Sequence, residues 1–335
     1  MKIWIDIKNV HEPLFFQSIT KSLNQYDFYM TCRDFAEIVG LLDKYNMDYK
    51  IIGGRAEGNL IKRKLAFSTR VINLILKVPK FDVSISHFSG WAAYTSKYRR
   101  RKHISFTDND IAHLTNKYVF KHVDFLITPK AIPKNILIDD GMKDSGIFQF
   151  DGFKEDIYIA DYTPDPNFLD SLPFNDFITI RPESLQATYV PEGVNSIVPD
   201  LLKKFSKENI NILFLPRYQS DKDYAKKFPN VYMPPKPLNG LDVCYHSKAI
   251  LTGAGTFSRE AAVMGTPAIS FYPGEEFLSV DKEMIDRKWV FHSRNSDDIV
   301  DYVLNSKSRA FNQDRCKETR KKVISILSEI LDSLG

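Results

Sequence analysis

Cysteines and long apolar runs are both scarce in this 335-residue sequence. Its apolar stretches, such as residues 71–76, are far shorter than the roughly 20 residues that a membrane-spanning helix needs. Asp6 stands where a secretory signal peptide would have its apolar core. The three cysteines, Cys32, Cys244 and Cys316, are too few and too widely separated for a disulfide framework or a zinc knuckle. We therefore expect a soluble cytoplasmic protein.

An excess of charge of one sign is also missing. The chain has 46 Lys and Arg against 42 Asp and Glu, a formal net charge of +4, which is too weak to favour nucleic acid as a partner. No H-E-x-x-H, G-x-x-x-x-G-K-S/T or Ser-His-Asp pattern occurs, which argues against a metalloprotease, a P-loop NTPase and the common hydrolases. With 43% apolar and 26% charged residues, the chain has a globular composition and a length suited to about two domains.

Short β-rich runs alternate with longer amphipathic stretches, a pattern typical of βαβ units around a parallel sheet. In the first half it predicts strands at 2–7, 28–32, 49–52, 82–86, 103–107 and 124–128, with helices at 12–25, 35–45, 59–76, 90–98 and 111–121. In the second half it predicts strands at 176–181, 211–216, 231–233, 249–252, 268–272 and 290–292, with helices at 194–206, 220–227, 240–246, 256–264, 297–304 and 314–334. Between these halves, five prolines in residues 129–173 predict an irregular segment.

This pattern predicts an α/β protein with two doubly wound, Rossmann-like lobes. We expect a first lobe at 1–155, an interlobe segment at 156–174, a second lobe at 175–310 and a C-terminal helix at 311–335. A ligand would then bind in the cleft between the lobes, near the carboxyl ends of the strands.

The stretch from 248 to 273 is the most informative for chemistry. Gly253 and Gly255 permit a tight turn after a strand, Thr256 or Ser258 can cap the following helix, and Gly265 can end it in the left-handed conformation. The start of such a helix presents free N–H groups and a positive dipole end, which suit a phosphate or diphosphate. The alternative is an ordinary corner between a strand and a helix.

The residues of this stretch resemble the donor-nucleotide motif of the GT-B glycosyltransferases and of the related UDP-N-acetylglucosamine 2-epimerases. The matching blocks are G-A-G-T at 253–256, R-E-A-A at 259–262 and G-T-P at 265–267. In those families the small-residue turn meets the diphosphate and the glutamate holds the ribose. The resemblance therefore implies a donor site formed by Gly253, Ala254, Gly255, Thr256, Arg259 and Glu260.

Over nearly its full length, the chain also resembles the prokaryotic family called domain of unknown function 354. The resemblance rests on M-K-I-W-I-D-I-x-N at 1–9, G-F-K-E-x-x-Y at 152–158, T-I-R-P-E at 179–183 and the block at 259–267. It implies a GT-B-like fold and a nucleoside-diphosphate sugar as substrate, with no required cofactor.

The end of the first predicted strand carries further candidates, which are Asp6, Asn9, His11 and Glu12. GT-B enzymes often carry a catalytic base in such a loop of the acceptor lobe. The resemblance thus implies that His11 or Glu12 takes the proton of an acceptor hydroxyl. The family usually has Pro-His where this chain has His11-Glu12, which leaves either residue as the base. The alternative is a helix start at which Glu12 only complements the helix dipole.

Two arginines are expected at strand ends of the second lobe. Arg181 ends one strand and Arg217 follows the next, so either can neutralise a leaving diphosphate, the alternative being a surface arginine. In the 2-epimerases a His-Pro pair lies near the position of Arg217. Its absence here favours a transferase over an epimerase.

His87 and Asp108 complete the acceptor-lobe candidates, with helix capping as the simpler alternative. The sequence D-N-D at 108–110 resembles a D-x-D metal site. Because GT-B enzymes generally bind their donor without a metal, we expect no metal, and a helix N-cap by one of these aspartates. Lys154 and Glu155 can also face the cleft, with hinge packing as the alternative.

A basic amphipathic stretch at 60–80, with Y-R-R-R-K-H at 98–103, can lie against anionic lipid at the inner face of the membrane. A core helix with a solvated basic face is the alternative.

Taken together, the motifs and the resemblance lead us to expect a glycosyltransferase that moves a sugar to an acceptor, either lipid-linked or a cell-surface glycan precursor. A nucleotide-sugar 2-epimerase and a non-catalytic nucleotide-sugar-binding protein are the two alternatives.

Overall fold

The computed structural model describes residues 1–54, 60–185, 190–191 and 193–335 and divides the chain into two units. Unit 1 comprises Met1–Tyr158 and Cys316–Gly335, and unit 2 comprises Ile159–Arg315. Each unit is built on its own parallel sheet, so the predicted α/β class with two Rossmann-like lobes is confirmed.

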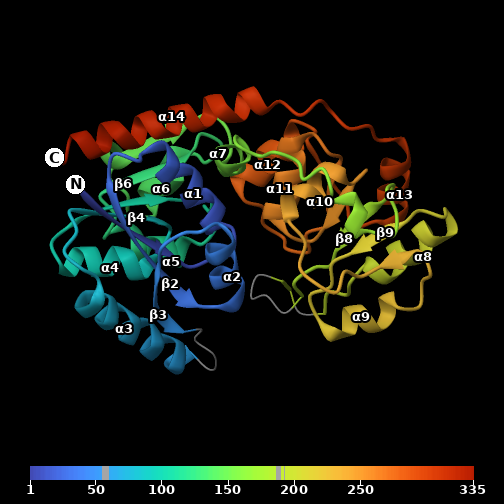
Figure 1. Ribbon diagram of the computed structural model, residues 1–335, viewed down its shortest axis with the longest axis horizontal. Helices are drawn as coiled ribbons and strands as arrows, with labels where there is room; N and C mark the ends of the chain where they lie inside the picture. Colours follow the sequence, from blue (N-terminus) through green and yellow to red (C-terminus); the bar gives the residue numbers. More distant parts are fainter. Residues whose placement is uncertain (55–59, 186–189, 192) are drawn as a thin grey trace. The chain divides into compact units, whose positions relative to one another are not determined.

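Unit 1 contains a sheet of seven parallel strands in the order β3-β2-β1-β4-β5-β6-β7 (Figure 1). The strands are β1 (Lys2–Ile7), β2 (Asp27–Asp34), β3 (Lys50–Gly54), β4 (Val83–His87), β5 (Lys102–Phe106), β6 (Phe125–Pro129) and β7 (Ile147–Phe150). The helices are α1 (Glu12–Ser22), α2 (Ala36–Lys44), α3 (Leu60–Lys77), α4 (Gly90–Tyr98), α5 (His113–Phe120), α6 (Lys134–Asp139), α7 (Lys154–Ile159) and α14 (Gln313–Asp332).

The central strand β1 is buried from Ile3 to Ile7, as expected for a parallel sheet that is covered on both faces. Its register places Asp6 beside Thr31 of β2 and Ser86 of β4. Because parallel strands all end at the same edge, the loops that follow β1 and β4 meet there. That edge holds the candidate residues of unit 1.

The segment 129–173 is more regular than predicted. It contains α6, β7, α7 and two short 3-10 turns, and β7 is the edge strand of the first sheet, paired with β6. Elements of only four to six residues are too short to show a clear hydrophobic period. The five prolines therefore led to the prediction of an irregular segment, because the pattern of β7 was too short to indicate a strand.

Unit 2 contains a sheet of six parallel strands in the order β10-β9-β8-β11-β12-β13. The strands are β8 (Ile178–Arg181), β9 (Ile212–Phe214), β10 (Val231–Tyr232), β11 (Ile250–Thr252), β12 (Ala268–Ser270) and β13 (Val290–His292). The helices are α8 (Val198–Lys207), α9 (Gln219–Ala225), α10 (Gly240–His246), α11 (Gly255–Met264), α12 (Ser279–Asp286) and α13 (Ser296–Asn305). The sequence analysis did not predict α12.

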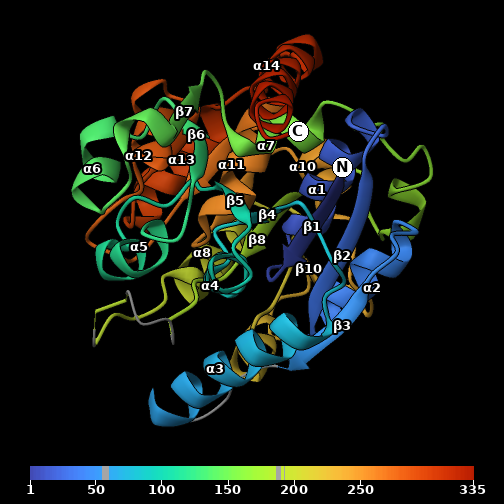
Figure 2. The same cartoon turned by 90° about the vertical axis from the view of Figure 1, so that its left-hand side faces the viewer.

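The C-terminal helix α14 runs beside α7 in both views of the molecule (Figures 1 and 2). The Cys316 thiol lies 3.3 Å from Oδ1 of Asp156. Gly152 has a φ of 121°, and a Cβ there would lie 2.6 Å from Cγ2 of Thr319, so this close contact requires glycine. Within the described residues, no helix is long and apolar enough to cross a membrane.

Candidate functional site

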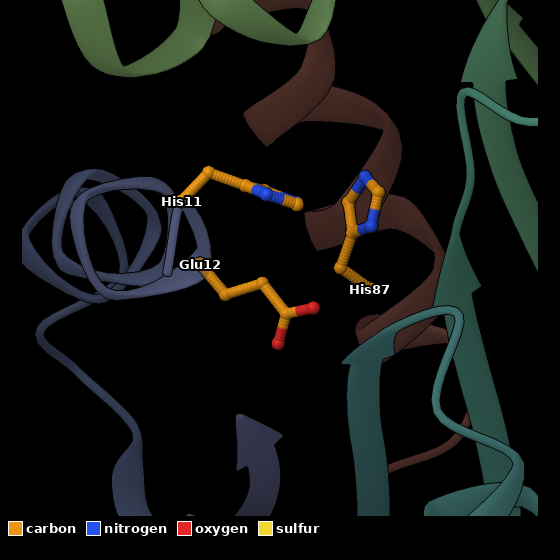
Figure 3. A group of neighbouring side chains, drawn as sticks. All are labelled: His11, Glu12 and His87. Carbon is orange, nitrogen blue, oxygen red and sulfur yellow. The ribbon is translucent and has the colours of Figure 1, made fainter. Parts of the chain in front are cut away.

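The loop between β1 and α1 brings three predicted residues together. His11, Glu12 and His87 point toward one another in Figure 3, and one titratable atom of each lies within 4.8 Å of the other two. The ring centres of His11 and His87 are 5.2 Å apart and their planes are almost perpendicular. We call these three residues the unit 1 cluster.

Glu12 is a fully buried carboxylate held by its own loop. Its oxygens accept hydrogen bonds from the Lys8 backbone N at 2.7 Å and from Nδ2 of Asn9 at 2.9 Å. Burial raises the pKa of Glu12 to about 7, although the charge of Lys8 and these hydrogen bonds oppose the shift. A carboxyl group with such a pKa can give or take a proton near neutral pH. Asn9 therefore positions a candidate base.

The two imidazoles of the cluster are neutral at neutral pH. Burial lowers the pKa of His87 to about 3, against the opposing effect of Asp108. Burial, reinforced by the charge of Lys154, also holds the pKa of His11 well below its usual range. Nε2 of His11 is buried and meets no hydrogen-bond partner among the described residues. These shifts favour Glu12 over His11 as the base, with the histidines able to bind a hydroxyl.

Asp108 lies on the other side of His87. Contrary to the prediction from the sequence, it does not cap a helix. Its Oδ2 accepts a hydrogen bond of 2.6 Å from Nζ of Lys154, and its Oδ1 lies 3.6 Å from Nε2 of His87. The following helix α5 begins only at His113, and Asn109 bonds the backbone N–H groups of the preceding turn instead. The N-cap residue of α5 is Ala112, so the prediction of an N-cap by Asp108 or Asp110 is wrong; Asp108 instead accepts from Lys154, which lies far along the chain.

The cluster also has the donor types of a transition-metal site, two imidazoles and a carboxylate. However, the positive charges of Lys154 and Lys8 both act on His11 and lower its pKa. The same charges oppose a divalent cation. The charge of Asp108 acts in the opposite direction, so the charges around His11 do not by themselves indicate a metal site. The raised pKa of Glu12 suits proton transfer.

Lys8 is a residue that the sequence analysis missed. It is partly buried, and its burial lowers the pKa of the ammonium group. Its Nζ lies 5.3 Å from the ring centre of Phe88, which has a φ of 55°, an unusual conformation for a bulky residue. The available signal was its position directly after β1, at the edge where ligands of such sheets bind.

Asp6, in contrast, has a structural role. Both of its oxygens accept hydrogen bonds from Arg70 of α3, at 2.7 and 3.0 Å, and Thr31 and Ser89 donate to it as well. Asp6 therefore lies inside β1 and not in the loop. Arg70 is likewise buried, so it is not part of the basic helix surface we had predicted.

A small, mostly apolar cavity lies next to the cluster. Its lining residues are Phe15, His87, Phe106, Thr107, Ile127, Pro129, Phe150, Lys154 and Ile157. Its few polar groups include the His87 ring and the Lys154 ammonium, so a polar group entering it would meet both.

In unit 2, the helix α11 begins at Gly255 after the predicted turn. Its N-cap is Ala254, which has no side chain able to cap, so the prediction of a cap by Thr256 or Ser258 is wrong. Oγ of Ser258 instead donates to the Gly255 carbonyl. At its other end α11 stops at Gly265 with a φ of 85°, which confirms the predicted left-handed C-cap. A helix start without a side-chain cap suits an anion.

Packing within unit 2 requires a glycine at position 253 and leaves little space for a side chain at position 255. A Cβ on Gly253 would lie 2.7 Å from the Cα of Glu183, and one on Gly255 would lie 2.9 Å from Nη1 of Arg259. Arg259 itself is buried and donates a 2.7 Å hydrogen bond to Oδ1 of Asp281 in α12. Arg259 thus links the first half of α11 to α12.

Arg181, Arg217 and Glu260 form the second group, here called the unit 2 cluster. Arg181 ends β8, Arg217 follows β9, and Glu260 lies in α11. Burial lowers the pKa of Arg181 to about 10, the charge of Arg217 lowers it further, and that of Glu260 opposes the shift. In the part of the chain that the structure describes, no side-chain hydrogen bond or ion pair is made by Arg181.

Arg217 is oriented by its own neighbours. Its Nε donates to the Pro182 carbonyl at 2.7 Å, and its backbone N donates to Asp221 at 2.9 Å. The charges of Arg217 and Glu260 both act on Arg181, so two guanidinium groups and one carboxylate lie near one another. This excess of positive charge, partly removed from water, is suited to a phosphate or diphosphate group.

Comparisons with known proteins agree with this architecture. A family model described as "Protein of unknown function (DUF354)" matches residues 1–332. The uncharacterized protein MJ0665 of Methanocaldococcus jannaschii is 28% identical over 317 residues, which cover 90% of this chain and 91% of that protein.

Several solved structures share the fold at low sequence identity. The UDP-GlcNAc 2-epimerase of M. jannaschii, in complex with UDP-GlcNAc and UDP, has a TM-score of 0.74 at 16% identity, with 98% of this chain and 100% of that chain covered. The UDP-GlcNAc 2-epimerase of Neisseria meningitidis has 0.75 at 12%, with the same coverage. Anabaena HepE, in complex with UDP and glucose, has 0.65 at 12%, covering 99% of this chain and 100% of that chain. At these identities the likeness establishes the fold.

Proposed function

Because the chain belongs to the DUF354 family and has the fold of nucleotide-sugar-binding proteins, we propose that it is a GT-B-like glycosyltransferase. Its donor is a nucleoside-diphosphate sugar, with a uridine nucleotide as the first choice because the fold neighbours bind UDP or a UDP-sugar. The acceptor is a hydroxyl of a glycan or of a lipid-linked sugar.

The unit 2 cluster is the observation that carries this proposal. Arg181 is a partly buried guanidinium that makes no side-chain hydrogen bond or ion pair in the described chain, and Arg217 adds a second positive charge beside it. A diphosphate supplies anionic oxygens to which both guanidinium groups can donate, and the N–H groups at the start of α11 add further donors. Glu260, one turn into α11, is suited to accept from the ribose hydroxyls.

The unit 1 cluster supplies the proton acceptor. Glu12 takes the proton of the acceptor hydroxyl as that oxygen forms a bond to the anomeric carbon. The bond from this carbon to the diphosphate breaks, and its electron pair stays on the diphosphate oxygen. Arg181 and Arg217 stabilise the charge that develops there.

Epimerisation of a nucleotide sugar is the second candidate, since two of the fold neighbours described above are UDP-GlcNAc 2-epimerases. It would use the same donor site and the acid–base groups of unit 1, without any acceptor. Arg217 counts against it, because the resemblance drawn from the sequence places a His-Pro pair there in epimerases.

Product analysis with a donor alone separates the two functions. The protein is incubated with UDP-GlcNAc, and with other UDP- and GDP-sugars, and the sugar is identified by NMR. A transferase leaves the sugar unchanged or slowly hydrolyses the donor, and releases nucleoside diphosphate faster when an acceptor is added. Conversion of the donor into its 2-epimer would overturn the transferase proposal in favour of the epimerase. Tight donor binding with no turnover under any condition would favour a binding protein.

A further inference from the structure

The helix α3 presents large aliphatic side chains to solvent along one stripe. The exposed fractions are 68% for Ile61, 62% for Leu65, 56% for Ile72 and 75% for Leu76. At 3.6 residues per turn, these four positions fall within an arc of about 60°. The opposite side of α3 is buried and packs against the sheet through Leu74 and Val78. The stripe is therefore not needed for the core of unit 1.

The neighbouring helices extend this apolar surface. α3 packs against α4, and α4 packs against α5. Tyr98 at the end of α4 is 72% exposed, and Leu114 and Tyr118 of α5 are 78% and 58% exposed. Seven of the twelve strongly exposed large apolar side chains in the described chain thus lie on this layer of three helices. Scattered surface hydrophobes are normal, but their concentration on one layer marks an interaction surface.

The charge of this layer has only one sign. α3, α4 and α5 contain no Asp or Glu at all. Exposed cations on and beside the three helices are Lys62, Arg63, Lys64, Lys77, Lys80, Lys97, Arg100, Arg101, Lys117 and Lys121. The acidic residues beside them are Asp124, which pairs with Lys102, and the exposed Asp82. Since the whole chain has a net charge of only +4, this is a marked local concentration. On the helical wheel, Lys62 and Lys64 lie on either side of the aliphatic stripe.

From these observations we infer that the α3–α4–α5 layer is a docking surface for an anionic lipid membrane. The stripe of α3 lies in the plane of the interface with its aliphatic side chains among the acyl chains. The flanking lysines extend to the lipid head groups, and the tyrosines occupy the boundary. A second copy of this layer would set cations against cations, which disfavours self-association through it. The inference does not depend on the proposed transferase activity.

Co-sedimentation of the full chain with lipid vesicles tests the inference. We expect binding to vesicles of mixed phosphatidylglycerol and phosphatidylcholine, weakened by salt, and little binding to phosphatidylcholine alone. The double substitution Leu65→Ser with Leu76→Ser removes two of the four aliphatic side chains of the stripe, and Lys62→Gln with Lys64→Gln removes two flanking charges. Each is expected to weaken vesicle binding by about tenfold or more.

Matched controls come from the surface of unit 2. Leu304→Ser removes a leucine that is 51% exposed, and Lys227→Gln removes an exposed lysine, and both should leave vesicle binding unchanged. Thermal unfolding checks that each variant folds. If the Leu65→Ser, Leu76→Ser variant does not fold, the Lys62→Gln, Lys64→Gln variant still tests the inference. Failure to bind anionic vesicles, or full binding by both double variants, would overturn the inference. A dimer that depends on the stripe, without vesicle binding, would assign the surface to a second copy instead.

Discussion

The buried titratable groups of the two clusters differ in whether they keep their charge at neutral pH. In the unit 1 cluster, burial moves every group toward its neutral form, so the pKa of Glu12 rises to about 7 and the pKa values of His11 and His87 fall. In the unit 2 cluster, Arg181 keeps its charge despite burial and a neighbouring arginine, because even a pKa of about 10 leaves it protonated at neutral pH. The first arrangement suits proton transfer, and the second suits the binding of an anion.

The largest expected effect comes from Glu12→Gln, which removes the base but keeps the size of the side chain. We expect kcat to fall by about 10²- to 10⁴-fold, the usual contribution of a general base, while donor affinity stays unchanged. Glu37→Gln is the matched control, since Glu37 also lies in the first turn of a helix of unit 1 but is exposed. Steady-state kinetics and donor titration measure both quantities. A variant with full activity would remove Glu12 from the mechanism.

Arg181→Ala tests whether the unit 2 cluster binds the diphosphate of the donor. A charge-assisted hydrogen bond to a phosphate contributes about 1.5–3 kcal/mol, so the dissociation constant for UDP should rise by about 10- to 100-fold. Arg287→Ala, which removes a half-exposed arginine paired with Glu283 in unit 2, should have no effect. Isothermal titration calorimetry gives the constants. Equal UDP affinity in the two variants would show that the unit 2 cluster does not hold the diphosphate.

Glu260→Ala sharpens the assignment within the unit 2 cluster. Loss of a ribose contact should weaken UDP binding by several-fold to about tenfold. Removal of a negative charge beside Arg181 should, in contrast, strengthen the binding of inorganic pyrophosphate, which has no ribose. Glu283→Ala is the control on the surface of α12. Weakened binding of both ligands would instead mean that Glu260 orients the arginines.

A further expected effect concerns stability and pH. The pKa of Glu12 in the native state, about 7, exceeds its ordinary value of 4.5, so the native state binds more protons than the unfolded state between these values. The contribution of this group is therefore most stabilising below pH 4.5 and is lost as the pH rises through 7. Relative to the wild type, Glu12→Gln should gain about 2 kcal/mol in free energy of unfolding between pH 5 and pH 8.5. Urea denaturation at both pH values measures this, and a pH-independent difference would contradict the buried carboxylate.

The alternation of strands and helices was predictable because short apolar runs and amphipathic stretches follow one another regularly along most of the chain. β1, α4 and α10 have the predicted bounds, and Gly265 ends α11 as expected. The elements of 134–159 were not predicted, since they have only four to six residues and lie between prolines, and α12 was not predicted either.

The candidate residues were mostly identified from their positions at strand ends, but their partners were not. Lys154 reaches Asp108 across 46 positions, and Arg259 reaches Asp281 across 22. Such pairings depend on how separate elements pack, which local sequence patterns do not encode. For the same reason, the sequence could not tell that Asp6 would face Arg70 inside the unit and that Glu12 would lie in the cluster.

The central claim is that the chain binds a nucleoside-diphosphate sugar, and thermal unfolding with a panel of nucleotides and nucleotide sugars tests it most directly. A ligand that binds only the native state at a hundredfold excess over its dissociation constant adds about 2.7 kcal/mol to the free energy of unfolding. We expect such stabilisation by one family of nucleoside diphosphates in the wild type, and its loss in Arg181→Ala. No stabilisation of the wild type by any member of the panel would contradict it.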